Sequence, residues 1–451
     1  MIERIDTNME RKNSTILMIS SGMKNKKKDF MNEDTENLYL NYGLLGLASL
    51  LYEKGFHGVR MFQGDFKEIG ELLQEIHDDG IDVQSLEYPV FLSIPSFFAL
   101  SWAQELIIRL KDKNPNIQII VGGRWTVDNN LDWIKNKLPL ADYISRGCPD
   151  DYIEELLDAK NWEKYQEPGV SKEIFTMLNY KLLYQYKQYQ PSIEISRGCG
   201  NGCAFCLEGN YKQTKVKSPL EVIQETKAIC NAYEDETLNF YFQASIFTPT
   251  LKWAKEFKEK YDEFQMKFKW RFETRVDHIN PNVIEILAQA GLKVIDLGLE
   301  SASVQQLERM EKTKNPSLYL QKARDLLEKA KDANVWCKLN VLLYAGETEE
   351  TIQETLKWLK QNTFKGVSVN PFILYLNGKG TGTFVEKIKE ITKMDVDMEK
   401  LYENGYLFID LSNEISSEKA KEKTKQITEI CMNKQDYWDL KNMGYTRRKG
   451  I

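Results

Sequence analysis

Three cysteines, Cys199, Cys203 and Cys206, lie within eight residues in a C-x3-C-x2-C spacing, with glycines between the thiols. A loop this short and this free of bulky side chains can direct three sulfurs towards one small group. Three thiolates suit a cubic [4Fe–4S] cluster and leave its fourth iron without a protein ligand. The spacing therefore predicts an iron–sulfur site whose open iron can bind a substrate and pass it an electron.

Zinc and disulfide bonds are the alternatives for these thiols. Structural zinc takes four ligands, usually in two separated pairs, whereas this chain has one triplet and four scattered cysteines. In the zinc alternative, His278 would be the fourth ligand beside the three cysteines. A disulfide framework is not expected, because the 7 cysteines are an odd number and the charged residues 1–12 lack the apolar core of a secretory signal.

The elements around the cysteine loop, and three later motifs, resemble the radical S-adenosylmethionine (SAM) superfamily. Residues 192–195 alternate as a strand before the loop, and residues 219–233 have helical apolar spacing after it. Residues 270–277 look like the third strand of the family. Residues 294–303 look like the fourth, with its G-x-E-S element, and residues 339–348 like the fifth, with its G-E-T turn.

This resemblance implies a partial (β/α)6 barrel over residues 185–375, with its chemistry at the carboxyl ends of the strands. In the family, SAM binds the open iron, and an electron from the cluster cleaves it to a 5′-deoxyadenosyl radical. That radical takes hydrogen from an unactivated carbon, while the protein orients the cofactor and excludes water. An external electron donor such as flavodoxin or ferredoxin is therefore an expected partner.

The resemblance also assigns SAM contacts residue by residue. Glu300 and Ser301 match the G-x-E-S element that faces the ribose and methionine moieties. Arg275 matches an arginine that meets the methionine carboxylate, although a salt bridge within the barrel is an alternative. Phe205 matches the aromatic residue whose backbone approaches the adenine. The turn near the adenine pocket is Gly346 and Glu347, and Glu347 can alternatively cap the helix expected at 349–360.

Several barrel residues have less certain roles. Gln243 and Ser245 follow the second strand, where relatives often carry two aspartates, and either bind a polar substrate or are neutral strand-end residues. Cys337 lies in the fifth strand, where an inward-facing thiol would return a hydrogen atom to a product radical; the alternative is a small core residue. His278 and Tyr344 are candidate acids or bases near the substrate.

The N-terminal part, residues 13–160, predicts an α/β fold in which strands and helices alternate. The strands are expected at 15–19, 59–62, 90–94, 117–121 and 141–144, and the helices at 44–52, 66–77, 99–112 and 150–159. Such alternation predicts a doubly wound parallel sheet of the Rossmann type, which binds ligands beyond the carboxyl ends of its strands. The loops 20–22, 93–96 and 122–126 are therefore expected to surround one crevice.

This half resembles the cobalamin-binding domain of one large radical SAM subgroup, through residues 43–48, the Gly-Gly pair after Val121, and residues 141–147. The resemblance implies bound cobalamin, with contacts from Ser93, Ser96, Gly122 and Gly123. The chain departs from the subgroup in two places, of which the first is usual in the subgroup and only the second weighs against cobalamin. No Asp-x-His-x-x-Gly sequence offers a histidine to cobalt, and Cys148-Pro149 replaces the common Gly-Glu. A structural remnant that binds no cobalamin is the alternative.

Composition limits the other possibilities. The 451 residues carry a net charge of −6, which gives no general electrostatic reason to bind nucleic acid or an anionic membrane. No apolar stretch is long enough to span a bilayer, so we expect a cytoplasmic protein. Residues 376–451 are predicted to form a small helical C-terminal region. Its glycine-rich start, 377–382, lacks the Lys-Ser/Thr of a phosphate-binding P-loop.

The sequence thus predicts a cobalamin-dependent radical SAM methyltransferase acting on an unactivated carbon in specialised metabolism. The alternative is a cobalamin-independent radical SAM dehydratase, deoxygenase or rearrangement enzyme on a sugar-like substrate. A non-enzymatic iron–sulfur sensor is a third possibility, and the SAM motifs argue against it. The substrate is a small molecule or a peptide, and the sequence does not identify it.

Overall fold

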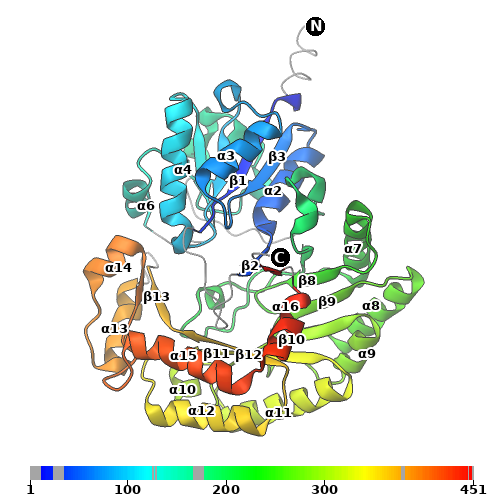
Figure 1. Cartoon of the computed structure of the whole chain (residues 1–451), viewed down its shortest axis with the longest axis vertical. Helices are drawn as coiled ribbons and strands as arrows, with labels where there is room; N and C mark the ends of the chain where they lie inside the picture. Colours follow the sequence, from blue (N-terminus) through cyan, green and yellow to red (C-terminus); the bar gives the residue numbers. More distant parts are fainter. Residues whose placement is uncertain are drawn as a thin grey trace.

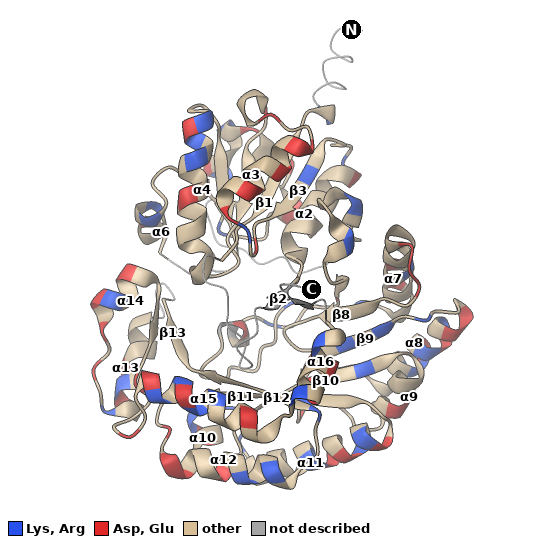
Figure 2. Cartoon of the chain, in the orientation of Figure 1, with Lys and Arg blue, Asp and Glu red and all other residues tan. Residues whose placement is uncertain are grey.

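The computed structural model describes residues 12–23, 35–123, 126, 130–165, 177–376, 381–444 and 446–448. Two parallel sheets are stacked along the long axis of the molecule, each with helices packed around it (Figure 1). Charged side chains of both signs are spread over outer helices such as α4, α11 and α15 (Figure 2). Among the described helices, none combines the length and the apolar character needed to cross a membrane.

The N-terminal sheet has five parallel strands in the order β3-β1-β4-β5-β6. They are β1 (Ile16–Ser20), β3 (Val59–Gln63), β4 (Val90–Ser93), β5 (Ile119–Gly122) and β6 (Tyr143–Ile144). The order reverses between β1 and β4, and ligands of such sheets bind at this topological switch point. The covering helices are α2 (Tyr42–Glu53), α3 (Ile69–Asp78), α4 (Leu100–Lys113) and α6 (Leu131–Lys137). The predicted doubly wound fold is confirmed.

Two predicted helices in this half differ from the structure. Helix α3 begins at Ile69 rather than at residue 66, because Phe66 has a left-handed φ of 62° and Glu68 forms a capping box with Glu71. The helix expected at 150–159 is wrong. Short 3-10 turns occupy this region, namely η3 (Pro149–Asp151), η4 (Glu155–Leu157) and η5 (Ala159–Tyr165). The Asp158 side chain accepts the Lys160 N–H at 3.2 Å, which favours a turn over a continuing helix.

The second sheet has six parallel strands in sequence order, with β7 and β12 at its two edges. The strands are β7 (Ser192–Glu194), β8 (Asn239–Gln243), β9 (Lys269–Arg275), β10 (Leu292–Glu300), β11 (Trp336–Leu343) and β12 (Gly366–Pro371). The helices outside them are α7 (Pro219–Tyr233), α8 (Leu251–Glu263), α9 (Val283–Gln289), α10 (Val304–Arg309), α11 (Pro316–Asp332) and α12 (Glu349–Gln361). This is the predicted open (β/α)6 barrel, and α7 has the predicted bounds.

The two faces of the barrel sheet have different chemistry. On the helix side, the Phe242 and Trp270 rings stack at 4.4 Å, and the Phe257 ring of α8 packs 5.5 Å from Trp270. On the inner side, the Arg271 guanidinium donates two hydrogen bonds of 2.9 and 2.7 Å to the Asp296 carboxylate. The half-buried Lys338 Nζ lies 3.4 Å from the same carboxylate, so charged side chains join β9, β10 and β11.

The register of β11 corrects the expectation for Cys337. In the parallel pairing of β10 with β11, Asp296 is opposite Lys338, and Ile295 is opposite Cys337. Because neighbouring residues of a strand point to opposite faces, Cys337 lies on the helix side with Ile295, away from the inner charged face. The thiol is buried, and burial raises its pKa to about 12. It is a core residue, and it does not line the barrel interior.

The region predicted as a helical tail contains strands as well. Its helices are α13 (Thr381–Thr392), α14 (Met398–Asn404), α15 (Ser417–Cys431) and α16 (Lys434–Asn442). Strand β14 (Tyr406–Phe408) pairs with β13 (Ile373–Tyr375), and β15 (Thr446–Arg448) pairs with β2 (Thr35–Asn37). A Cβ atom on Gly366 of β12 would lie 2.4 Å from Leu440 of α16, so this region packs closely over the last barrel strand. Residues 377–380 of the glycine-rich segment lie outside the described part of the chain.

We expect Asp296→Asn to reduce the free energy of unfolding by about 3–5 kcal/mol, because it leaves the buried Arg271 guanidinium without a carboxylate partner and also removes the partner of the half-buried Lys338. Denaturant titration of the purified protein measures this difference. The matched control is Asp262→Asn, which breaks an exposed pair with Lys258 on α8 and should cost less than about 1 kcal/mol. Equal losses in the two variants would contradict the structural role of Asp296.

Candidate functional site

The cysteine loop directly follows β7, and its glycines determine its path. Gly198, Gly200 and Gly202 have φ values of 71°, 73° and 67°, which favour glycine. At Gly198 a Cβ atom would lie 2.5 Å from the Lys212 carbonyl oxygen, so a side chain has no room there. The Cys199 N–H donates to the Tyr211 carbonyl at 2.8 Å, which ties the loop to the segment that returns from it.

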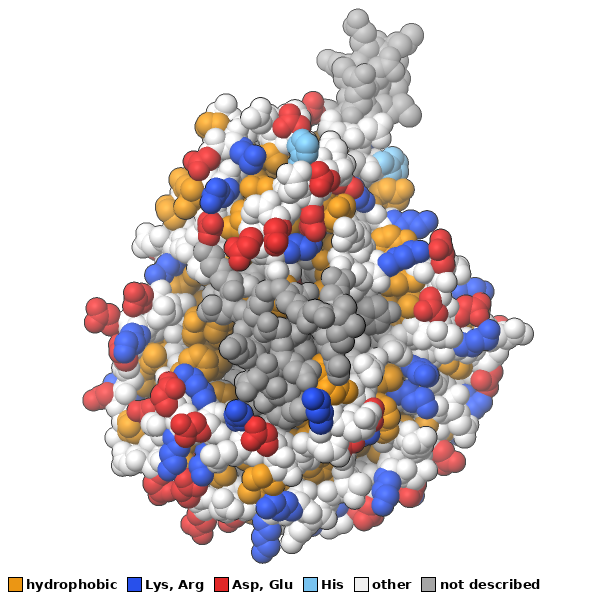
Figure 3. Space-filling view, viewed as in Figure 1, with side chains coloured by type: hydrophobic (Ala, Val, Ile, Leu, Met, Phe, Trp, Pro, Cys, Tyr) orange, Lys and Arg blue, Asp and Glu red, His pale blue; other side chains and the backbone are white. Residues whose placement is uncertain are grey.

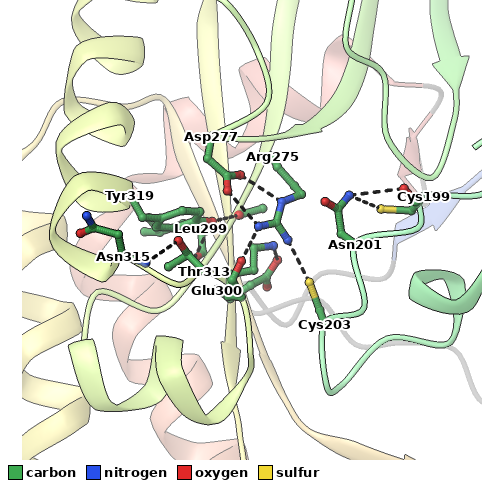
Figure 4. Close-up of polar contacts among 12 residues, drawn as sticks. Cys199, Asn201, Cys203, Arg275, Asp277, Leu299, Glu300, Thr313, Asn315 and Tyr319 are labelled. Atoms are coloured by element: carbon green, nitrogen blue, oxygen red, sulfur yellow. Dashed lines mark hydrogen bonds and ion pairs between the residues drawn. The ribbon is translucent and has the colours of Figure 1, made fainter.

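Each of the three sulfurs accepts hydrogen bonds from the protein. Asn201 Nδ2 donates to Cys199 Sγ at 2.8 Å, and Arg275 Nη1 donates to Cys203 Sγ at 2.9 Å (Figure 4). Cys206 receives backbone N–H groups from the following 3-10 turn, η8 (Leu207–Asn210). Donors on a ligating sulfur stabilise the anionic thiolate and tune the reduction potential of an iron–sulfur cluster.

These observations test whether the loop fits the cluster. Within the described ranges, no group of three or more His, Cys, Asp and Glu side chains is arranged around a single metal ion, with or without His278. A cubic cluster makes a different demand, because each thiolate binds a different iron and the sulfurs need not meet at one point. A glycine-bent loop with a donor on every sulfur therefore fits a [4Fe–4S] cluster.

Arg275 connects this loop to the barrel. It ends β9, and its guanidinium forms two 3.0 Å contacts with the Asp277 carboxylate (Figure 4). It also donates to the Lys312 carbonyl and, as described above, to Cys203 Sγ. These partners match the alternative of a salt-bridged barrel residue, and they place the guanidinium beside the cluster loop. Its contact with the SAM carboxylate stays a prediction.

Glu300 forms an ion pair that the sequence did not reveal. It has a left-handed φ of 64° at the end of β10, and its Oε1 lies 2.9 Å from Lys312 Nζ. The ammonium also lies 5.6 Å from the centre of the Phe205 ring. Gly298 makes room for this pair, because a Cβ there would lie 2.8 Å from Glu300 Oε1. Glu300 and Phe205, both predicted SAM contacts, thus contact the same buried lysine. The sequence did not indicate Lys312, because its Glu-Lys-Thr-Lys context is typical of an exposed segment.

Two further predicted SAM contacts are engaged within the protein. Ser301 is buried, and its hydroxyl is 3.0 Å from the Thr355 hydroxyl of α12. Gly346 has a φ of 82°, its N–H donates to the Leu411 carbonyl at 2.6 Å, and its carbonyl accepts from Arg309. Contacts of Ser301 and Gly346 with SAM stay predictions.

Glu347 supports the start of helix α12. Thr348 is the N-cap residue of the helix, and the Glu347 carboxylate accepts a hydrogen bond from the Thr351 hydroxyl. Glu347 is 1% exposed, and burial raises its pKa to about 7. Thr348 rather than Glu347 therefore caps α12, and a contact of Glu347 with SAM stays a prediction.

The remaining candidates lie at different depths of the barrel. Tyr344 is buried, and its ring lies 6.3 Å from that of Phe205. His278 is exposed on the turn after β9. Glu273, which the sequence did not single out, lies on the inner face, where burial and the nearby Asp296 carboxylate raise its pKa to about 7. It is an additional candidate for binding a polar group inside the barrel.

A cavity of about 930 Å³ lies between the carboxyl edge of the N-terminal sheet and the barrel. This volume is at the upper end of the usual range for ligand pockets. The four predicted cobalamin contacts all line it, namely Ser93, Ser96, Gly122 and Gly123. From the barrel side it is lined by Arg197 and Gly198, next to the cysteine loop, and by Gln243 and Ser245. The structure therefore brings the predicted cobalamin contacts and the two strand-end candidates, Gln243 and Ser245, to one space.

The sheet edge of this cavity fits a large ligand with hydrogen-bonding groups. Asn41 Nδ2 donates to Ser20 Oγ at 2.9 Å and to Ser93 Oγ at 3.0 Å, which joins β1 and β4 at the switch point. Ser96 Oγ is buried and has no hydrogen-bond partner in the described part of the chain. A Cβ on Gly122 would meet Ser145 only at 3.7 Å, so packing within the protein does not require glycine there.

On the barrel side, Arg197 joins the two halves of the chain. Its guanidinium contacts Glu194 at 2.8 and 2.9 Å and Asp150 at 3.1 Å. Asp150 belongs to η3 of the N-terminal half, whereas Arg197 lies two residues before Cys199. The two strand-end candidates are also engaged, since Gln243 Nε2 donates to Ser192 Oγ at 3.3 Å and Ser245 Oγ to Glu208 at 3.1 Å.

An open parallel barrel with a three-cysteine loop after its first strand defines a class of iron–sulfur enzymes. The model of the Radical SAM superfamily matches residues 193–359. Residues 193–359 therefore belong to the radical SAM superfamily, and the chain is a radical SAM enzyme, as predicted. The [4Fe–4S] cluster and SAM are the cofactors of this superfamily.

Relatives of known name cover more of the chain. An uncharacterised methyltransferase of Pyrococcus horikoshii is 22% identical over 352 residues, which are 71% of this chain and 72% of the relative. The threonylcarbamoyladenosine tRNA methylthiotransferase MtaB of Bacillus subtilis is 23% identical, and the match covers 53% of each chain. The chain thus spans about half the length of that methylthiotransferase.

Two solved structures share the fold. The radical SAM methyltransferase TsrM from Kitasatospora setae, with cobalamin and a [4Fe–4S] cluster bound, superposes with a TM-score of 0.59 at 14% identity, covering 79% of this chain and 72% of TsrM. The cobalamin-dependent SAM radical enzyme OxsB, with aqua-cobalamin bound, gives a TM-score of 0.58 at 16% identity, covering 79% of this chain and 53% of OxsB. At these identities the likeness establishes the fold.

Glu347 predicts a pH-dependent stability. Its pKa is about 7 in the folded protein and near 4.5 when unfolded, so the folded state holds the extra proton and stability falls as the pH rises through this interval. Glutamine cannot lose a proton, so Glu347→Gln should not share this loss of stability. We expect the free energy of unfolding of the variant, relative to that of the wild type, to rise by about 1–3 kcal/mol from pH 4.5 to pH 8. Anaerobic urea titrations at both pH values measure the difference. Glu354→Gln, an exposed residue of α12, controls for the loss of one carboxyl, and a constant difference for Glu347→Gln would contradict the assignment.

Proposed function

We propose that this chain is a cobalamin-dependent radical SAM methyltransferase that acts on an unactivated carbon of a small molecule or peptide. The supporting observation is the cavity of about 930 Å³, which the carboxyl edge of the N-terminal sheet shares with the barrel side beside the cysteine loop. Transfer of a group between two cofactors needs such a common space. The fold shared with TsrM and OxsB, whose structures contain cobalamin, supports the same function.

When bound, the cluster and SAM supply a radical that takes hydrogen from carbon, and cobalamin carries a methyl group. The protein holds these groups through its own side chains. Cys199, Cys203 and Cys206 bind the cluster, and the Asn201 and Arg275 donors stabilise two of the thiolates. The sheet edge with Ser93, Ser96, Gly122 and Gly123 takes the corrin, and apolar cavity walls such as Met23, Leu47, Phe91 and Phe98 exclude water.

The proposal includes an external electron donor, such as flavodoxin or ferredoxin, because nothing in the reaction itself reduces the cluster. A nucleic-acid substrate is not part of the proposal. On the face shown in Figure 3, acidic and basic side chains are intermixed rather than gathered by sign. A backbone-binding protein would gather its lysines and arginines into a basic patch. The cytoplasm remains the expected location, since it suits an oxygen-sensitive cluster.

We expect serine at Cys199, Cys203 or Cys206 to abolish both iron binding and the formation of 5′-deoxyadenosine, because three thiolates are the minimum that hold the cluster with one open iron. Anaerobic reconstitution followed by iron and sulfide analysis measures the loss. Cys431→Ser, at the end of α15, is the matched control and should bind as much iron as the wild type. Full turnover in any of the three loop variants would refute the cluster site.

We expect the reconstituted wild type to retain added hydroxocobalamin through gel filtration and to need it for methylated product. The visible absorbance of the protein fraction and mass spectrometry of the product report the two results. Deoxyadenosine formation and a dehydrated, deoxygenated or rearranged product without any corrinoid requirement would instead support the dehydratase, deoxygenase or rearrangement alternative. A product carrying a methylthio group would place the chain with the methylthiotransferase relatives.

A further inference from the structure

Asp65 lies in a tight turn at the edge of the N-terminal sheet. The turn follows β3, and Asp65 and Phe66 both line the cavity. Its backbone is closely packed, since a Cβ on Gly64 would lie 2.5 Å from the Trp102 ring, and one on Gly22 would lie 2.0 Å from the Gly64 carbonyl oxygen. The Gly64 N–H donates to the Ser20 carbonyl at 2.9 Å, which fixes the turn to β1 at the switch point.

This turn contains two unfavourable features. Phe66 has a φ of 62°, a conformation that is strained for a bulky residue and costs on the order of 1–3 kcal/mol. The Asp65 Oδ1 atom is buried and has no hydrogen-bond partner among the described residues. Burial raises the pKa of this carboxyl to about 6, and the Lys67 ammonium nearby is held by Glu75 at 2.6 Å.

Strain and an unsatisfied buried polar atom, both at the wall of a ligand-sized cavity, indicate a binding function. Buried polar atoms in native proteins are almost always hydrogen-bonded, so an exception requires a missing partner. Strained residues that persist are concentrated at ligand clamps and active sites. The missing partner must donate a hydrogen bond, because a carboxylate oxygen only accepts. Packing does not explain the carboxyl, since the close contacts of the turn are made by Gly22 and Gly64.

We propose that Asp65 is a cofactor-recognition residue that accepts hydrogen bonds from the primary amides on the rim of the corrin ring. The inference rests on the cobalamin dependence proposed above. A primary amide offers two N–H donors and one carbonyl acceptor, so it needs both an acceptor and a donor from the protein. At this cavity Asp65 Oδ1 supplies an unoccupied acceptor and Ser96 Oγ an unoccupied donor. The neighbouring Asn41 amide already donates to the hydroxyl oxygens of Ser20 and Ser93.

The test compares corrinoid binding by the full chain, reconstituted anaerobically, in three forms. The forms are wild type, Asp65→Ala, and Asp112→Ala, in which an exposed residue near the end of α4 is changed. Equilibrium dialysis with hydroxocobalamin, read by visible absorbance, gives the dissociation constants. We expect Asp65→Ala to bind hydroxocobalamin roughly tenfold more weakly than the wild type, and Asp112→Ala to bind it as tightly as the wild type. The iron content should be the same in all three forms. Asp65→Asn keeps the turn and one acceptor and should lie between them.

A second probe separates amide recognition from a general loss of structure. Cobalamin monocarboxylates, in which one rim amide is hydrolysed, place a carboxylate where an N–H donor was. The wild type should reject at least one of these isomers, and Asp65→Ala should discriminate less against it. Equal binding of hydroxocobalamin by wild type and Asp65→Ala overturns the assignment of Asp65 while the proposed function stands. If the wild type binds no corrinoid, the proposed function itself is overturned.

Discussion

The site depends on the hydrogen bonds that the Arg275 guanidinium donates. A single planar group contacts Cys203 of the cysteine loop, the Asp277 carboxylate beyond β9 and the Lys312 carbonyl beyond β10. These three partners come from separate parts of the chain, so the guanidinium fixes the loop relative to the barrel strands. Arginine is suited to this because its donors are rigidly spaced and always charged. The same loop is tied to the N-terminal half by Arg197 and Asp150.

Parallel strands place the chemistry of both sheets in one space. All strands of such a sheet end at the same edge, and ligands bind beyond that edge. Here the edge of the N-terminal sheet, with Ser93 and Gly122, and the barrel strand ends, with Gln243, line the same cavity. The buried Arg271–Asp296 pair lies deeper in the barrel and closes its inner face below the site. The fold thus separates a rigid interior from an accessible upper rim.

Much of this arrangement could be predicted from the sequence, because it depends on local patterns. The strand–helix alternation predicted the N-terminal sheet, and the family resemblance implied the barrel sheet. Ser218, Pro219 and Glu221 gave α7 its predicted start through a capping box. The cysteine spacing predicted the loop, and the Gly-Gly pair at the end of β5 predicted a cavity wall. The boundaries proposed for the three regions of the chain stay predictions.

The rest depended on information that no local pattern contains. The face of Cys337 is set by a register that only the paired strand defines. The segment at 150–159 has a helical composition, but its turns are held by distant partners such as Arg197. Lys312 and Asp65 lie in ordinary polar stretches, and only burial gives them significance. Long-range contacts, rather than propensities, decided each of these cases.

The pairing of β15 with β2 links sequence positions that are synthesised far apart in time. Tyr39 and Leu40, two and three residues after the end of strand β2, form part of the cavity wall. Domains that emerge early from the ribosome generally fold early. Here the five-stranded sheet can form during translation, but this wall gains its partner strand only after residues 446–448 have been made. This part of the cavity wall is consequently completed only after nearly all of the chain has been synthesised.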